Sequence, residues 1–370
     1  MKVAYYSPLP PSRSGIADYS ALLLPALAER MDVVVARPPG RFRRERLRRE
    51  PVADVFLYHV GNDPAEHGWI VEALRRRPGI VVLHEFVLHH LISGITLARG
   101  DVEGYLGALE REAGLVGRLL GYAVIDDRIR PLWESRPQDF PLAGEVLRDA
   151  TGLVVHSDYV TGRARDAGFA GPIWKVPMPA WPVPDVVPAD VPGEPLVGCF
   201  GHVNESKRVP QLLEAFGRWR RRRPDARLLL VGAISPRLAE LDLPEWVIRR
   251  DYVPEDELWS LLAACDAVVG LRWPTMGETS AAAVRALSLG KPLVVTDVGA
   301  FRELPDGVAV KVPAGEGEID GIEAALERVT TSPEMGDAAR RLAATEHRLD
   351  LVADAYAAAL ASSIEPACAA

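Results

Sequence analysis

Short apolar runs alternate with amphipathic stretches along nearly the whole chain. In the first half the apolar runs have the length of strands, and they are Val3–Tyr6, Val33–Ala36, Val55–His59, Ile80–Leu83 and Gly152–His156. The stretches between them, such as Tyr19–Glu29 and Ala65–Arg77, carry apolar residues at helical spacing. Apolar strands that alternate with helices predict a parallel sheet covered by helices on both faces.

A proline-rich segment interrupts this alternation near the middle of the chain. The prolines are Pro177, Pro179, Pro182, Pro184, Pro188, Pro192 and Pro195. Proline lacks a backbone donor and fixes φ, so this segment is expected to be an extended linker.

The same alternation resumes after the prolines. The predicted strands are Leu196–Phe200, Arg227–Val231, Ala267–Leu271 and Pro292–Thr296, and the predicted helices include Val209–Arg222, Glu255–Ala264, Ser280–Leu289 and Gly321–Thr330. A chain of 370 residues also fits two domains of about 150 residues each. The sequence therefore predicts an α/β protein with two Rossmann-like, doubly wound parallel-sheet domains. Because such sheets bind ligands beyond the carboxyl ends of their strands, we expect the two domains to face each other across a cleft.

Composition narrows the class of protein. A net charge of −8 argues against a nucleic-acid binder, and 48% hydrophobic with 25% charged residues is typical of a soluble globular protein. The three cysteines lack metal-type spacing, and no apolar run reaches the ~18 residues of a membrane span, so we expect a cytoplasmic protein. The basic block Arg41–Arg49 suits peripheral contact with anionic lipid, although a solvated loop or helix face is the preferred interpretation.

The first candidate motif is the turn between the predicted strand Leu196–Phe200 and the predicted helix Val209–Arg222. Gly201, His202, Lys207 and Arg208 lie in this turn. Glycine lets the backbone approach a ligand, the helix N-terminus offers N–H groups, and Lys207 adds a positive charge. These features suit a diphosphate, but a solvated loop with an incidental Lys-Arg pair explains them equally well.

The second candidate motif spans residues 272–280 and opens the next predicted helix. Gly277 favours a tight turn, and Thr279 or Ser280 can cap the helix, whose N–H groups favour an anion. Glu278 is unusual beside a phosphate and suits a sugar or ribose hydroxyl, or positive charge developing on a sugar carbon. The alternative is that Glu278 is simply an acidic residue of the first helical turn, where the helix dipole favours it.

The first half contributes two weaker candidates. Gly15 lies in a loop after the first predicted strand, just before Tyr19–Glu29, and could cover a phosphate or sugar, although the full Gly-x-Gly-x-x-Gly fingerprint is missing. His84 directly follows a predicted strand, where sites are built. We favour a polar contact with a sugar or acceptor over a zinc site, because His84 and His89 are five residues apart and nothing nearby completes a ligand set.

Together these segments resemble the GT-B glycosyltransferases, specifically the large family 4 of retaining enzymes. The resemblance covers nearly the whole chain and is strongest in Phe200–Leu213, Arg227–Gly232 and Asp251–Asp297. Val155-His156-Ser157 resembles the Val-His-Ser segment that these proteins carry before the hinge, and residues 277–280 resemble the family's Gly-Glu-Thr-Ser variant.

The resemblance implies roles for single residues. Lys207 matches the lysine that neutralises the donor diphosphate, and His202 stands where many members have an arginine. Gly15 resembles the glycine-loop contact to the diphosphate, and His84 resembles the N-domain histidine near the donor sugar.

Glu278, with the amides of Thr279 and Ser280, falls in the family's Glu-x7-Glu segment. The second glutamate of that motif usually holds the nucleotide ribose, but Ala286 stands at its position, next to Arg285. We interpret this difference as a trait of the subgroup, with activity retained.

The resemblance also implies domain boundaries. They are residues 1–178 for an acceptor-side domain, 179–195 for the linker and 196–348 for a nucleotide-sugar domain. Helix 349–361 would return to the first domain.

The implied reaction is transfer of a sugar from a nucleoside-diphosphate sugar to a hydroxyl of a glycan, lipid or small-molecule acceptor. Such a hexosyltransferase-type enzyme of glycan biosynthesis would retain the anomeric configuration. Glu278, His84 and Lys207 would be its catalytic residues. Lys207 and the helix start at Thr279 would stabilise the leaving diphosphate, with no metal or other cofactor and with the nucleotide sugar as co-substrate.

Two alternatives stay open. A sugar-nucleotide epimerase on the same fold would need acid/base pairs around the donor and no acceptor channel. A non-catalytic nucleotide-sugar-binding protein would explain the missing second glutamate.

Overall fold

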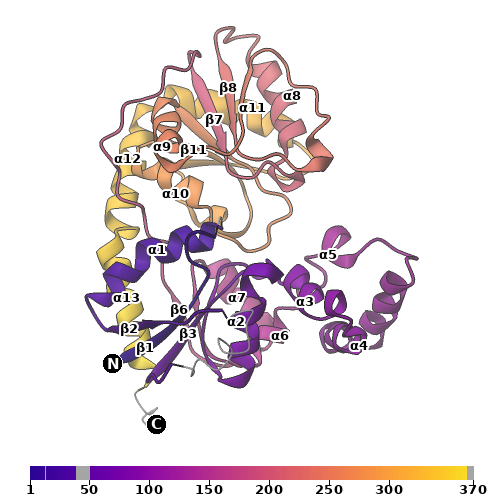
Figure 1. The fold of residues 1–370 in the computed structure, drawn as a ribbon. Coiled ribbons are helices and arrows are strands. Elements are labelled where there is room, and N and C mark those ends of the chain that lie inside the picture. The colour runs from indigo at the N-terminus through magenta and orange to yellow at the C-terminus, as the bar shows by residue number, and fades with distance from the viewer. Residues whose placement is uncertain (13, 39–50, 365–370) are drawn as a thin grey trace. The chain divides into compact units, whose positions relative to one another are not determined.

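The computed structural model describes residues 1–12, 14–38 and 51–364. Its contacts divide the chain into two compact units. The first comprises Met1–Pro177, Met276–Thr279 and Leu349–Ala370, and the second comprises Met178–Thr275 and Ser280–Arg348. Each unit contains a six-stranded parallel sheet with helices, which confirms the prediction of two Rossmann-like α/β domains (Figure 1). The basic block Arg41–Arg49 lies outside the described residues.

The sheet of the first unit has the strand order β2-β1-β3-β4-β5-β6. Its strands are β1 (Lys2–Tyr6), β2 (Asp32–Val35), β3 (Val55–Val60), β4 (Gly79–Leu83), β5 (Ala150–Val155) and β6 (Ile173–Lys175). Every residue of β3 and β4 is buried, because these central strands have neighbours on both sides and helices on both faces. The carboxyl ends of β3, β4 and β5 therefore meet at one edge of the sheet.

One helix of the first unit begins earlier than the hydrophobic pattern predicts. The helices of this unit are α1 (Gly15–Ala28), α2 (Pro64–Arg76), α3 (His89–Ile95), α4 (Val102–Ile125), α5 (Leu132–Ser135), α6 (Gly144–Leu147), α7 (Asp158–Asp166) and α13 (Leu349–Ser362). Ser14 caps α1 by accepting a hydrogen bond from the Ala17 amide, so Gly15 is the first helical residue. This corrects the expectation that Gly15 lies in a loop before the helix.

The first and last helices of the chain lie side by side in this unit (Figure 1). The hydroxyls of Tyr19 and Tyr356 are 2.6 Å apart, and Arg30 pairs with Asp354 at 2.6 Å. The region of α1 and the helix α13 are thereby joined by polar contacts as well as by packing.

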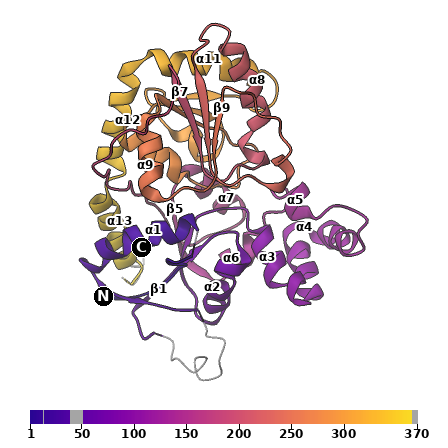
Figure 2. The ribbon, with the colours of Figure 1, turned by 45° about the horizontal axis from the view of Figure 1, so that its top comes forward.

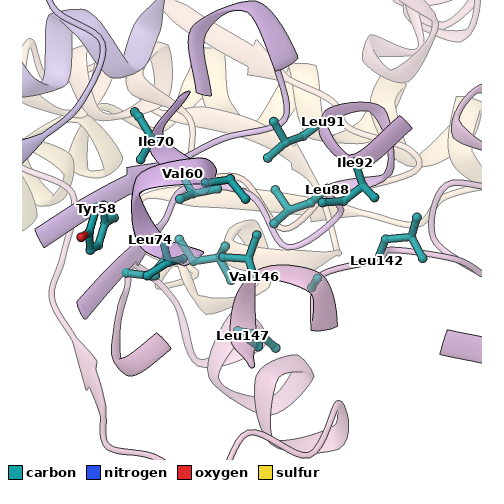
Figure 3. Close-up of a cluster of buried hydrophobic side chains, with 14 of the residues drawn as sticks. Tyr58, Val60, Ile70, Leu74, Leu88, Leu91, Ile92, Leu142, Val146 and Leu147 are labelled. Carbon is teal, nitrogen blue, oxygen red and sulfur yellow. The ribbon is translucent and has the colours of Figure 1, made fainter. Parts of the chain in front are cut away.

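A compact apolar cluster supports the sheet of the first unit (Figure 3). Its labelled members come from β3, from α2, from the region of α3 and from the segment around α6, and they are Tyr58, Val60, Ile70, Leu74, Leu88, Leu91, Ile92, Leu142, Val146 and Leu147. Burial of one such leucine or isoleucine stabilises the fold by about 2 kcal/mol. The cluster fixes the segments that follow β3 and β4, where His84 lies.

The sheet of the second unit has the order β12-β11-β10-β7-β8-β9. Its strands are β7 (Leu196–Phe200), β8 (Arg227–Val231), β9 (Val247–Arg250), β10 (Ala267–Gly270), β11 (Leu293–Thr296) and β12 (Ala309–Val312). Residues 178–193, which contain most of the prolines, form no helix or strand and belong to this unit. The strand β7 lies between β8 and β10, so the turns after these three strands are neighbours.

The helices of the second unit are α8 (Val209–Trp219), α9 (Glu255–Ala264), α10 (Ala281–Ser288), α11 (Glu318–Thr331) and α12 (Pro333–Glu346). Helix α8 ends three residues before the predicted Arg222, and the guanidinium group of its C-cap residue Arg220 donates to the carbonyls of Pro224 and Ala226. Helices α8 and α11 lie next to each other in both views (Figure 2). Among the described residues, no helix combines the length and the apolar character needed to cross a bilayer.

Candidate functional site

Lys207 lies buried beneath the turn that follows β7. It ends the 3-10 turn η2 (Glu205–Lys207), is 8% exposed, and donates from Nζ to the carbonyl oxygen of Phe200. Gly201 has φ +90°, and a Cβ at that position would lie 3.3 Å from Lys207 Nζ. The ammonium group thus lies beside Gly201 at the carboxyl end of β7, where open α/β sheets bind ligands.

The backbone of Gly201 is held by the turn after the neighbouring strand. A Cβ at Gly232 would lie only 2.3 Å from the carbonyl oxygen of Gly201. The Val203 amide donates to the Ala233 carbonyl at 2.8 Å. Both glycines have positive φ, so the turns after β7 and β8 approach each other as closely as they do because neither residue carries a side chain.

The segment after β10 contacts the same 3-10 turn. Arg272 Nη1 donates to Ser206 Oγ at 3.1 Å, and the Trp273 amide donates to the Ser206 carbonyl at 2.7 Å. The Arg272 amide donates to Thr296 Oγ1 at 2.9 Å, so the ends of β7, β10 and β11 are linked. Sequence reasoning did not select Arg272, although a cation immediately after a buried strand is a signal that could have found it.

Arg208 is engaged in an ion pair. Its Nε and Nη2 donate to the two carboxylate oxygens of Glu318 at 2.9 and 2.5 Å, and the Glu318 side chain is 1% exposed. Hydrogen bonding to this carboxylate raises the pKa of Arg208. The structure therefore gives Arg208 a partner within the protein. His202, in the same turn, is exposed.

Glu278 lies in the segment Met276–Thr279, which belongs to the first unit. The amides of Phe86 and Val87 donate to the Met276 carbonyl at 2.8 and 3.0 Å. Gly277 has φ +86°, and a Cβ there would lie 2.9 Å from Phe86 Cβ. Glu278 Oε2 accepts the Met276 amide at 2.7 Å, so the carboxylate is held by its own turn.

Ser280 is the residue that caps α10. Its Oγ accepts the Ala283 amide at 3.2 Å, and Thr279 immediately before it is half-buried. Ser280 and Lys207 belong to the second unit and Glu278 to the first, so the predicted convergence of Glu278 and Lys207 on one ligand stays a prediction.

His84 lies inside a buried cluster of rings at the carboxyl edge of the first sheet. Its Nε2 is 3.0 Å from His59 Nδ1. The centre of its ring is 5.3 Å from that of His156 and 4.9 Å from that of Tyr19, which it meets edge to face. Burial, and then the neighbouring imidazoles, hold the pKa of His84 far below its usual value. His84 is therefore neutral near pH 7 and suited to hydrogen bonding rather than to carrying charge.

This cluster contains two histidines that were not selected from the sequence, and it does not include His89. His59 lies one residue before the end of β3 and His156 directly follows β5. Neither was selected as a candidate, although each lies at the end of an apolar run. His89 instead bonds the Phe140 carbonyl at 2.7 Å and the Tyr105 hydroxyl at 2.9 Å, away from His84. Over the described residues, no group of three or more His, Cys, Asp or Glu is placed to hold a metal ion.

Gly15 lies exposed at the start of α1. A Cβ there would meet no atom within 4 Å. Packing within the protein therefore gives no reason for glycine at this position, and the space above it is open to a ligand.

Comparison with known proteins bears first on the second unit. Residues 194–332 match the family model described as glycosyl transferases group 1. This range lies within residues 178–348, most of which form the second unit. The Lys207 turn and the Arg272–Ser280 segment both lie in the matched range. No curated protein matches the chain.

Solved glycosyltransferase structures share the fold over nearly the whole chain. A sucrose-phosphate synthase from Thermosynechococcus elongatus has a TM-score of 0.63 and 15% identity, and the alignment covers 98% of this chain and 100% of that one. HepE from Anabaena, in complex with UDP and glucose, has a TM-score of 0.62 and 15% identity with the same coverage. AviGT4, involved in avilamycin A biosynthesis, has a TM-score of 0.53, 18% identity and 99% coverage of both chains. At these identities the likeness shows the fold, which is the GT-B fold with two Rossmann-like domains.

Proposed function

We propose that the chain is a retaining glycosyltransferase that moves a sugar from a nucleoside-diphosphate sugar to an acceptor hydroxyl. The observation that carries the proposal is the Lys207 ammonium, buried beside Gly201 at the carboxyl end of β7. The match of residues 194–332 to group 1 glycosyltransferases supports it. HepE was crystallised with UDP and glucose, which makes a uridine nucleotide a natural first donor to test.

Each candidate residue receives a role in this proposal. Lys207 stabilises the diphosphate as it leaves, Gly201 lets the backbone approach it, and the amides of Thr279 and Ser280 add hydrogen bonds. A fixed positive charge in a partly buried turn stabilises a developing anion without reorganising at the moment of reaction. No metal ion or other cofactor is needed for this step.

Glu278 and His84 act on the sugar. The carboxylate of Glu278 accepts hydrogen bonds from sugar hydroxyls and favours positive charge on the sugar carbon. His84, neutral because its pKa is lowered, forms a hydrogen bond with the donor sugar. Gly15 leaves room for the diphosphate at the start of α1.

Thermal-shift measurements with UDP-, GDP-, ADP- and TDP-sugars test donor binding. A ligand at about 100 times its dissociation constant stabilises the folded protein by roughly 2.7 kcal/mol. We expect a shift with one diphosphate class, and we expect Lys207→Met to abolish it. Lys311→Met is the matched control, because Lys311 lies in the same unit and pairs with Asp306 at 2.9 Å. Equal responses to every nucleotide, to none, or in both variants would refute the assignment.

A product assay separates transfer from the two alternatives. Wild-type protein is incubated with the binding donor, with and without an acceptor mixture, and the released nucleotide and the sugar products are analysed by NMR. Acceptor-dependent nucleotide release with a retained anomeric centre supports the proposal, and Glu278→Gln should slow it strongly. An epimerised nucleotide sugar, or binding without turnover, would replace the proposal with one of the alternatives.

A further inference from the structure

The first unit contains a cavity of about 520 Å³ beside α4, α6 and α7. Its lining includes residues of these three helices and of the segment between α5 and α6. A volume of this size falls in the range of small-molecule sites, which is roughly 300 to 1,000 Å³. None of the roles proposed above uses this cavity.

Positively and negatively charged side chains line the cavity in nearly equal numbers. Three guanidinium groups contribute, those of Arg111, Arg148 and Arg163. Four carboxylates contribute as well, those of Glu112, Asp139, Glu145 and Asp166. The carboxylates outnumber the guanidinium groups, so the lining offers no surplus positive charge to an anion such as a sugar phosphate. It offers many hydrogen-bond donors and acceptors to an uncharged ligand.

Two of the arginines are fixed by the same buried carboxylate. Arg111 Nε and Nη2 donate to the two oxygens of Glu145 at 2.7 and 2.9 Å, and Arg148 also pairs with Glu145. The Glu145 side chain is 6% exposed. The Glu145 carboxylate offsets part of the positive charge of the two arginines and holds their guanidinium planes in place, so their outward N–H groups are preorganised donors.

The lining also offers two hydrogen-bond acceptors, the carboxyl group of Glu112 and the carboxamide of Gln138. Burial raises the pKa of Glu112, although a hydrogen bond from the Leu142 backbone and the charge of Arg163 oppose the shift. Gln138 adds a group that both donates and accepts. Planar groups of this kind match neighbouring hydroxyls on a sugar ring.

Two residues of the cavity lining contact the turn that carries Glu278. Phe86 lines the cavity, and its amide donates to the Met276 carbonyl at 2.8 Å. Gln138 lines it too, and its Nε2 is 3.4 Å from Met276 Sδ. Because Met276 and Glu278 belong to one short turn, these contacts connect the cavity wall to the turn that carries the candidate catalytic carboxylate.

We infer that this cavity binds the acceptor, and that the acceptor presents a neutral, hydroxyl-rich saccharide unit there. The inference rests on the proposed function and deepens it by naming the acceptor class. The saccharide takes hydrogen bonds from the arginines held by Glu145 and gives them to Glu112 and Gln138. Its reacting hydroxyl faces the turn of Met276 and Glu278.

Saturation-transfer NMR on the full chain, with UDP present, tests this inference with defined probes. The neutral probes are sucrose, maltose and cellobiose, and glucose with glucose 6-phosphate forms a matched pair that differs in charge. We expect at least one disaccharide to bind, and glucose 6-phosphate to bind no more tightly than glucose. Gln138→Leu removes the carboxamide and should weaken disaccharide binding about tenfold.

A second variant blocks the cavity without disturbing its surroundings. A Cβ at Gly144 would have the Glu112 carboxylate as its one neighbour within 4 Å, at 3.8 Å, so Gly144→Val fills space that is empty. This variant should lose disaccharide binding and keep the thermal shift with the nucleotide sugar, which also shows that it folds. Arg128→Ala is the control, because Arg128 pairs with Asp126 on the surface outside the lining.

Different experimental results would contradict the cavity assignment and the proposed function. If the wild type responds to no nucleotide sugar, the proposed function is wrong whatever the saccharides do. If a nucleotide sugar binds but no disaccharide does, the cavity assignment is wrong. The same holds if glucose 6-phosphate binds more tightly than glucose, or if Gln138→Leu and Gly144→Val both bind disaccharides as the wild type does.

Discussion

Replacement of Gly232 by alanine tests whether the turns after β7 and β8 are packed as tightly as the structure indicates. Gly232 has φ +136°, a conformation that is essentially restricted to glycine. A Cβ there would lie 2.3 Å from the carbonyl oxygen of Gly201 and 2.7 Å from its carbonyl carbon. Both are backbone atoms, so no side-chain rotation relieves the contact, and the Gly201 turn must move by roughly 1 Å to reach ordinary van der Waals separation.

The expected loss of stability has two parts. A non-glycine residue at such a φ costs about 1–3 kcal/mol, and displacement of a packed segment adds about 1–3 kcal/mol. We therefore expect Gly232→Ala to lower the free energy of unfolding of the second unit by about 3 kcal/mol. For a unit of this size, each kcal/mol shifts the midpoint by about 2–4 °C, so the melting temperature should fall by about 6–12 °C.

Gly315→Ala separates backbone strain from the close contact. Gly315 lies in the same unit with φ +90°, but a Cβ there would meet no atom within 4 Å. Thermal unfolding followed by circular dichroism should show a clearly smaller loss for Gly315→Ala than for Gly232→Ala. Nucleotide-sugar affinity should fall in Gly232→Ala alone, because that substitution displaces Gly201. Equal losses of stability in the two variants would refute the reasoning from the close contact.

Three further substitutions give expected outcomes. Gly15→Ala should leave stability unchanged or raise it by about 0.5 kcal/mol, because its Cβ meets nothing, yet should weaken nucleotide-sugar binding in a titration. Burial lowers the pKa of His67 from 6.5 to about 4, so the unfolded chain binds this proton more readily. Above pH 6.5, neutral His67 makes its full contribution to the free energy of unfolding, and about 3 kcal/mol of this contribution is lost as the pH falls to 4. In urea unfolding, His67→Gln should therefore make the free energy of unfolding depend less steeply on pH in this range. Glu318→Gln leaves Arg208 without its countercharge and should cost about 2 kcal/mol in the same assay, whereas an unchanged midpoint would show that solvent already screens the pair.

The hydrophobic pattern predicted central strands better than edge strands. Strands such as β3 and β7 are buried along their whole length, so they stand out as apolar runs. The pattern missed β6, β9 and β12, each of which lies at an edge of its sheet. An edge strand has one neighbour and one solvated side, so β9 tolerates the sequence Val-Ile-Arg-Arg, which lacks an apolar run.

The candidate site divides in a similar way between local and distant contacts. The Lys207 turn was predictable, because its glycine, its lysine and the helix start lie within a few residues of each other. The partner of Arg208 was not, since Glu318 lies 110 residues further along the chain. The rings around His84 come from separate strand ends and from α1, and only the strand order of the sheet brings them together.

The missing second glutamate of the resembled motif has a physical explanation in the second unit. Ala286 is 0% exposed inside the apolar cluster under α10, where a carboxylate would be buried without a partner. The adjacent Arg285 is committed elsewhere, because its guanidinium lies 3.7 Å from the ring centre of Trp181 and pairs with Glu255 at 3.0 Å. This part of α10 is therefore built for packing, which favours donor recognition through the diphosphate at Lys207 over recognition of the ribose from this helix.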